Sequence, residues 1–104
     1  MQNFNDILKT LNSADHVKEI ELYTGSKLLG SIESKPGKLG SIKVYNHLFE
    51  TFGEINLNAA KNGLTLFSEH TEDAQNNPGK HPNIDILLNV INSETTLRIK
   101  IIEY

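Results

Sequence analysis

Side chains that could bind a metal ion, move protons or hold an anion are concentrated between residues 69 and 83. The segment Glu69-His70-Thr71-Glu72-Asp73 is followed closely by Pro78-Gly79-Lys80-His81-Pro82-Asn83. Together they bring two histidines, three carboxylates and a lysine to the end of one predicted helix and the start of the next. A functional site in this chain is therefore expected first at this corner.

Three side chains of this corner allow two kinds of chemistry. His70, Asp73 and His81 supply two imidazoles and a carboxylate, the usual number of protein ligands around a zinc or iron ion with an open position. A carboxylate one helical turn from a histidine can also orient the imidazole for general acid–base catalysis. The spacing matches no established signature such as His-Glu-x-x-His, so we assign neither metal ligands nor catalytic residues.

The same corner has a simpler interpretation as an exposed helix end. Acidic side chains near a helix C-terminus oppose the helix dipole, and Glu69, Glu72 and Asp73 would occupy that position. A neighbouring cation is needed to compensate them, and Lys80 is the simplest choice. In this interpretation the two histidines only cap or pack.

A second candidate site is the turn Lys35-Pro36-Gly37-Lys38-Leu39-Gly40-Ser41. Proline followed by glycine fits a type II turn, and Ser41 is expected to cap the helix that follows. A glycine turn that opens a helix presents backbone N–H groups and the positive end of the helix dipole to an anion, with lysines nearby. The P-loop pattern is absent, and the glycines could serve only the geometry of the connection.

Composition limits the class of protein. The chain has 104 residues, of which 38% are hydrophobic and 22% charged, so we expect a single globular domain over residues 1–104. The net charge of −3 disfavours nucleic-acid binding, which needs clustered lysine and arginine. No apolar stretch approaches the roughly 20 residues that span a bilayer, and the N-terminus lacks the features of a signal peptide. The absence of cysteine fits a cytoplasmic protein.

Hydrophobic periodicity and capping residues predict four helices and three strands. In chain order these are a helix at 3–13, strands at 18–24 and 27–34, helices at 41–52, from Asn56 or Asn58 to about Gln75, and at 82–92, and a strand at 95–103. Ala59 and Gly63 lie beside the apolar stripe of the longest helix and would permit close approach of another helix. Tyr45 falls on the apolar stripe of its own helix and is expected in the core.

The hairpin at 18–34 allows two registers. A two-residue loop, Gly25-Ser26, would send Leu28 and Ile32 away from the core. A three-residue loop, Thr24-Gly25-Ser26, would keep Leu28 and Ile32 on the core face. We prefer the three-residue loop, because a slip of one residue inverts every side chain of the strand.

Charge sets the expected order of the strands. The outward side of the first strand carries Glu19 and Glu21, while that of the C-terminal strand carries Arg98 and Lys100. Opposite charges on neighbouring strands are stabilising, so the C-terminal strand is placed beside the first. We therefore predict an α+β domain, α-β-β-α-α-α-β, with a small, mainly antiparallel three-stranded sheet of order 2-1-3 and helices packed on one face.

Two parts of the sequence resemble a bacterial protein family. They are the run Ile32-Glu33-Ser34-Lys35-Pro36-Gly37-Lys38-Leu39-Gly40-Ser41, and the run Glu69-His70-Thr71-Glu72-Asp73-Ala74 with Pro78-Gly79-Lys80-His81-Pro82-Asn83-Ile84-Asp85. Both look like a family of bacterial proteins of about this length that is known only as a domain of unknown function. The resemblance spans most of the chain and implies a bacterial cytoplasmic origin. It also implies that the two loops lie on the same part of the molecule, and it implies no activity, cofactor or catalytic residue.

We interpret the chain as a small non-enzymatic binding or interaction protein without a cofactor. Its partner, which the sequence does not identify, is expected to be a protein or a small anionic ligand. Binding to nucleic acid or to a membrane is not expected. The site is a polar surface formed by the 35–41 turn and the 70–83 corner. Its expected binding residues are Lys35, Lys38, Ser41, His70, Asp73, Lys80 and His81.

Two rival interpretations remain open. The first is a metal-binding protein or a small hydrolase-like enzyme that uses His70, Asp73 and His81. The second is a structural homodimer through the open face of the sheet. The apolar side chains expected on that face are Tyr23, Leu29 and Ile102, which would form an interface if they are contiguous.

Overall fold

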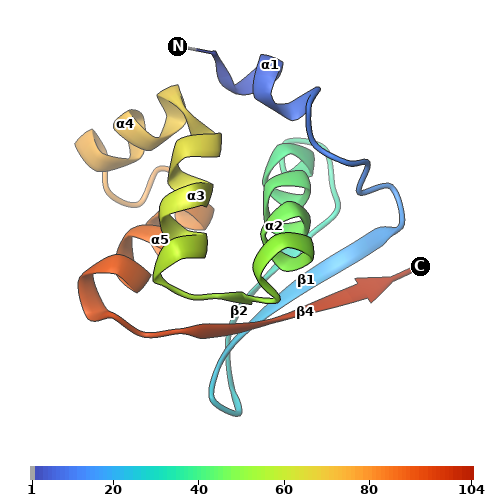
Figure 1. The fold of residues 1–104 in the computed structure, drawn as a ribbon, viewed down its shortest axis with the longest axis vertical. Helices are drawn as coiled ribbons and strands as arrows, with labels where there is room; N and C mark the ends of the chain where they lie inside the picture. Colours follow the sequence, from blue (N-terminus) through green and yellow to red (C-terminus); the bar gives the residue numbers. More distant parts are fainter. Residues whose placement is uncertain (1) are drawn as a thin grey trace.

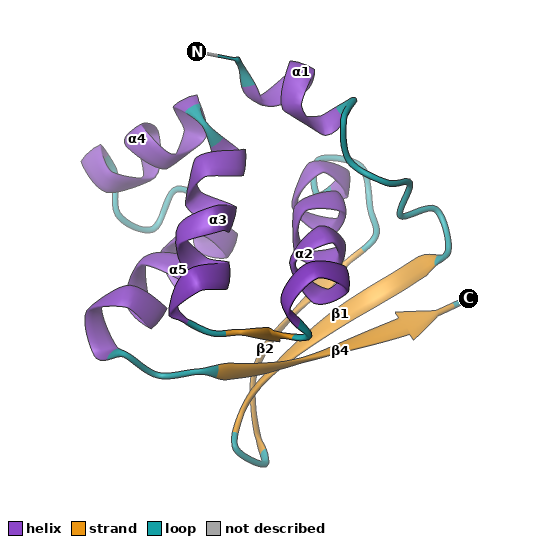
Figure 2. Ribbon diagram, in the orientation of Figure 1, coloured by secondary structure: helices purple, strands orange, loops and turns teal. Residues whose placement is uncertain are grey.

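The computed structural model describes residues 2–104, which form five helices and four strands (Figure 1). The helices are α1 (Phe4–Leu8), α2 (Leu39–Phe52), α3 (Leu57–Phe67), α4 (Glu69–Asn76) and α5 (Pro82–Ser93). The strands are β1 (Val17–Thr24), β2 (Lys27–Glu33), β3 (Glu54–Ile55) and β4 (Leu97–Glu103). The helices lie over one face of the sheet (Figure 2), which confirms the predicted α+β class. Within the described residues, no helix has the length and apolar character needed to cross a membrane.

The sheet has four strands in the order β2-β1-β4-β3, so the predicted three strands in the order 2-1-3 are wrong in number. The placement of the C-terminal strand beside the first is confirmed, because β4 pairs antiparallel with β1 and sets Lys100 opposite Glu21. The missing strand is β3, whose two residues pair with Arg98 and Leu97. Two residues are too few to show an alternating pattern, so β3 leaves no periodic signal in the sequence.

The β1–β2 hairpin differs from the predicted register. Thr24 pairs with Lys27, so the loop has two residues and the preferred three-residue loop is wrong. A β-bulge after Leu22 then shifts the register back. As a result Ile32 is buried in the core as expected, whereas Leu28 is 49% exposed.

Charged residues interrupt the open face of the sheet. The hydroxyl of Tyr23 donates a hydrogen bond to Glu21 (2.9 Å), and the guanidinium of Arg98 lies 5.2 Å from the centre of the tyrosine ring. Glu21 and Lys100 are paired across the strands between Tyr23 and Ile102. The apolar surface that a homodimer would bury on this face is therefore not continuous.

The helix predicted from residue 56 to residue 75 is two helices, α3 and α4, separated at Ser68. This residue has a φ of 52°, which a right-handed helix cannot contain. Its hydroxyl donates a hydrogen bond to the carbonyl oxygen of Gln2 (2.8 Å). The break puts Glu69 and Glu72 in the first turn of α4, where the helix dipole favours acidic side chains. The prediction that they lie at a helix C-terminus is wrong.

The N-terminal helix is shorter than predicted. Asn3 caps α1, but the helix ends at Leu8 rather than near residue 13. The reason is a turn in which the carbonyl oxygen of Ile7 accepts hydrogen bonds from both the N–H and the hydroxyl of Thr10.

Helices α3 and α5 pack closely at Gly63. A Cβ atom at this position would come within 2.7 Å of Leu87 Cδ1 and 3.0 Å of Leu48 Cδ1. The predicted role of Gly63 in close helix approach is thereby confirmed. Tyr45 is fully buried in the core, also as predicted. The core therefore fixes α2, α3 and α5 against one another above the sheet.

Candidate functional site

A pocket with a cavity volume of about 470 Å³ opens where the 35–41 turn meets the 70–83 corner. Its walls come from all five helices, from β2 and from the loops before α2 and α5. The lining residues are Phe4, Ser31, Gly37, Lys38, Gly40, Ser41, Phe67, His70, Lys80, His81, Pro82, Asn83 and Ile84. The structure therefore brings together the two loops that the sequence singled out.

Most of the predicted binding residues line this pocket, namely Lys38, Ser41, His70, Lys80 and His81. Lys35 does not line it and instead forms an exposed ion pair with Glu33 (Nζ–Oε2 2.7 Å). The hydrogen bond and charge of Lys35 hold the pKa of Glu33 below its usual range. Asp73 is also absent from the lining, but it contacts two residues that belong to it.

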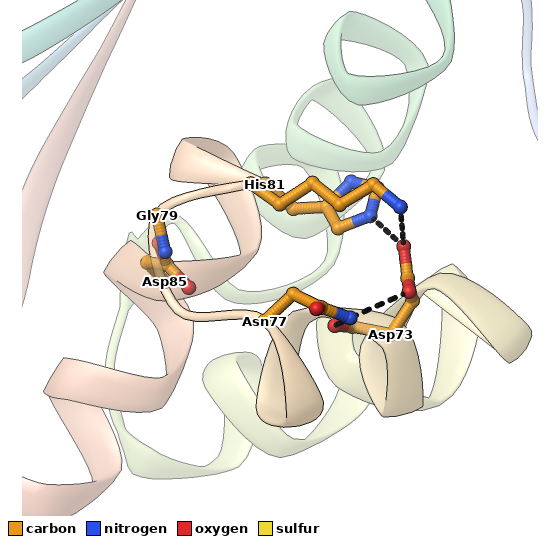
Figure 3. Close-up of polar contacts among 6 residues, drawn as sticks. Asp73, Asn77, Gly79, His81 and Asp85 are labelled. Atoms are coloured by element: carbon orange, nitrogen blue, oxygen red, sulfur yellow. Dashed lines mark hydrogen bonds and ion pairs between the residues drawn. The ribbon is translucent and has the colours of Figure 1, made fainter.

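Asp73 holds His81 and Lys80, which both line the pocket, and Figure 3 shows its contact with His81. Its Oδ2 atom lies 2.7 Å from His81 Nε2 and 2.9 Å from Lys80 Nζ. Its Oδ1 atom accepts a hydrogen bond from the side-chain amide of Asn77 (3.0 Å). The hydrogen bond from His81, followed by that from Lys80, lowers the pKa of Asp73 to about 2. Lys80 is thus the compensating cation that the sequence predicted.

The ionised state of Asp73 determines the tautomer of His81. A carboxylate only accepts hydrogen bonds, so the Nε2–H of His81 is the donor in this contact. Neutral His81 then carries no proton on Nδ1, which is left as an acceptor. A carboxylate can orient an imidazole for acid–base chemistry in this way.

The corner itself is fixed by a second carboxylate. The backbone N–H of Gly79 donates a hydrogen bond to Oδ2 of Asp85 (3.0 Å); both residues are labelled in Figure 3. Gly79 has a φ of 91°, a conformation that favours glycine. Asp85 lies in the first turn of α5, where its charge also suits the helix dipole.

A row of four aromatic rings, here called the aromatic wall, runs from the corner along the pocket. Its members are His81, His70, Phe4 and Phe67, which all line the pocket. Successive ring centres are 5.6, 5.0 and 5.4 Å apart. Gly40 admits the ring of Phe4 to the start of α2, because a Cβ atom at Gly40 would come within 2.8 Å of Phe4 Cε2.

Two helices begin at the pocket without a side-chain cap. Lys38 and His81 are the N-cap residues of α2 and α5, and neither side chain bonds to the first turn that follows. Ser41 lies inside the first turn of α2, so the prediction that it caps this helix is wrong. In the uncapped first turn of α2 the backbone N–H groups lack intrahelical acceptors, which favours an anion at that end.

Comparison with known proteins gives a family but no characterised relative. A family model described as an uncharacterized protein conserved in bacteria, DUF2322, matches residues 4–101. The chain belongs to the DUF2322 family. The resemblance drawn from the two loops is thereby confirmed, and the matched range contains every residue that lines the pocket. No curated protein and no solved structure matches the chain.

The metal interpretation gains no support from the geometry of this DUF2322 chain. Among residues 2–104, no group of three or more histidine, aspartate or glutamate side chains is placed to hold a metal ion. His70 and His81 are neighbours, but the Asp73 oxygen nearest to them is already bonded to His81 and Lys80. These side chains therefore resemble a hydrogen-bonded positioning network more than a set of metal ligands.

The aromatic wall was not predicted from the DUF2322 sequence. Phe4 and Phe67 lie on apolar helix stripes, which predict core packing and nothing more. The wall forms only because α1 folds back against α3 and α4, where the backbone N–H of Phe4 donates a hydrogen bond to Glu69 (2.8 Å). The sequence holds no local signal for that contact between distant segments.

Proposed function

We propose that this DUF2322 protein is a small bacterial cytoplasmic binding protein whose pocket takes the anionic group of a small ligand. The observation that carries the proposal is the charge of the pocket wall. Two lysines, two histidines and no acidic side chain are among the described residues that line it, although the whole chain has a net charge of −3. A concave site with local positive charge attracts anions.

Lys38 supplies most of this positive charge. None of the ion pairs among residues 2–104 involves Lys38. A cation at the N-terminus of a helix is unfavourable for the helix dipole, and an anion bound between Lys38 and the first turn of α2 would offset this. Lys80 contributes less, because Asp73 already balances its charge.

Acid–base catalysis at the same pocket is a second candidate, favoured by the 2.7 Å contact between Asp73 and His81. In that case His81 Nδ1 would act as the base toward the bound ligand. The two candidates differ in what His81→Ala does. The catalytic candidate predicts that turnover is abolished while binding persists, whereas the binding candidate predicts only weaker binding.

An NMR titration with inorganic phosphate and with acetate tests the binding proposal. We expect amide shift changes in the wild type to concentrate in residues 37–41 and 80–84, and to be lost in Lys38→Glu. Lys35→Glu is the matched control, because it makes the same charge change in the same turn outside the pocket. Equal responses of the two variants, or a wild type that does not respond to millimolar anion, would refute the proposal.

A further inference from the structure

The geometry points to the class of ligand: a small organic acid, with an anionic head joined to a planar apolar body. This inference rests on the proposed function and deepens it. The observation behind it is the aromatic wall, whose four rings lie in one row along the pocket that Lys38 also lines. An anion alone would make no use of that wall.

The pocket is larger than an anion requires. Its volume of about 470 Å³ lies within the range of roughly 300–1,000 Å³ that is typical of small-molecule sites. Bare phosphate or acetate would fill a small part of it and leave the half-buried ring of Phe4 in contact with water. An apolar body would displace that water and remove apolar surface from it, which is favourable.

The arrangement of the rings favours a flat body. Phe4 is stacked on Phe67 with an interplanar angle of 21°, and His70 meets Phe4 edge-on at 86°. Aromatic groups prefer offset stacking and edge contacts, so a planar ligand could extend the row without rearranging it. Phe67 is only 3% exposed, and the rings available for contact are therefore Phe4, His70 and His81.

The site for the anionic head lies next to this wall. Phe4 approaches the start of α2 at Gly40, where a Cβ atom would come within 2.8 Å of its ring. Gly40 follows Lys38 closely and precedes Ser41 in the uncapped first turn of α2. One ligand can therefore place its charge against Lys38 and the α2 amides and its body against Phe4.

Isothermal titration calorimetry with matched probes separates the body from the head. Phenylacetate and acetate share the charged head, while phenylacetamide has the same body without the charge. We expect phenylacetate to bind about tenfold or more tightly than either of the other two, a difference that calorimetry resolves readily. Phenyl phosphate compared with inorganic phosphate repeats the measurement with the other head and shows which head is preferred.

Phe4→Leu tests the wall directly. The variant should lose the preference for phenylacetate over acetate and keep its affinity for acetate. Phe49→Leu is the control, because Phe49 is 38% exposed on α2 and does not line this pocket. If Phe4→Leu fails to fold, His70→Leu removes the neighbouring ring of the wall and is expected to reduce the same preference.

Each outcome of these titrations has a definite meaning. Equal affinity for phenylacetate and acetate would overturn the inference and leave the proposed function standing. Phenylacetamide binding as tightly as phenylacetate would overturn it as well, because the ligand would then need no charge. Failure of every probe to bind would overturn both this inference and the proposed function.

Discussion

The hydroxyl of Tyr45 on α2 donates a hydrogen bond to the backbone carbonyl oxygen of Asn83 in the first turn of α5. Asn83 lines the pocket, so this bond joins the two helices whose N-termini open there. Tyr45 is fully buried, and burial raises its pKa. The hydroxyl therefore keeps its proton and remains a donor at any pH near neutrality.

Tyr45→Phe should lower the free energy of unfolding by about 1–3 kcal/mol, because the acceptor at Asn83 would lose its buried donor. In a domain of this size each kcal/mol lowers the melting temperature by roughly 4–8 °C, which differential scanning calorimetry will resolve. Tyr23→Phe is the control, since that hydroxyl lies on the open face of the sheet, and we expect a change within about 0.5 kcal/mol. An unchanged melting temperature for Tyr45→Phe would show that this bond does not hold α2 to α5.

Gly63→Ala should destabilise the protein, although alanine normally favours a helix over glycine by about 1 kcal/mol. The added methyl group would meet Leu87 and Leu48, which are both fully buried in the core. Overpacking of this kind costs about 1–3 kcal/mol, measured as a lower midpoint of urea unfolding.

The matched control for Gly63→Ala is Gly30→Ala. A Cβ atom at Gly30 has no neighbour within 4 Å, and its φ needs no glycine. The control should keep its urea midpoint. A rise in the urea midpoint of Gly63→Ala would mean that α3 and α5 can move apart without loss of stability. The close contact at Gly63 would then not be needed.

Asp73→Asn should lower stability near pH 6 and have less effect in acid. The pKa of Asp73 is lowered to about 2 in the folded protein, against about 3.9 in an unfolded chain. Its stabilising contribution is therefore complete above about pH 4 and is lost as the pH falls toward 2. Urea midpoints of wild type and variant should differ near pH 6 and converge near pH 2.

Glu72→Gln controls for the loss of a charge from the same helix. Glu72 is exposed in the first turn of α4, and its replacement should not reproduce the pH-dependent gap. A gap for Asp73→Asn that stays constant from pH 6 to pH 2 would show that its carboxylate is not preferentially ionised in the folded state.

Local patterns in the sequence predicted much of the fold. Complementary charges on Glu21 and Lys100 placed β4 beside β1 correctly, and Pro82 marked the true start of α5. The errors arose where distant contacts decide the outcome. The helix break at Ser68 has no glycine or proline, and its hydroxyl bonds to a residue near the N-terminus. The bulge after Leu22 likewise restores the register in which Ile32 is buried in the folded sheet.

In the candidate site, too, only the features with local sequence patterns could be predicted. The polar residues at its two loops could be identified because glycine turns, lysines and histidines are visible as local patterns. Two of the assigned residues, Lys35 and Asp73, do not line the pocket. Phe4 and Phe67 could not be identified as pocket residues, because hydrophobic periodicity cannot separate a ring that faces a pocket from one that faces another helix.

Glu94→Gly should stabilise the protein. Glu94 ends α5 in the left-handed conformation, with a φ of 55°, which costs a residue with a side chain about 1 kcal/mol or more and costs glycine little. The change also removes a negative charge from the C-terminus of a helix, where the dipole disfavours it. We therefore expect a gain of about 1 kcal/mol and a melting temperature roughly 4–8 °C higher. Asn92→Gly, inside the same helix, should instead lower stability, and a similar loss for Glu94→Gly would contradict the strain assigned to this cap.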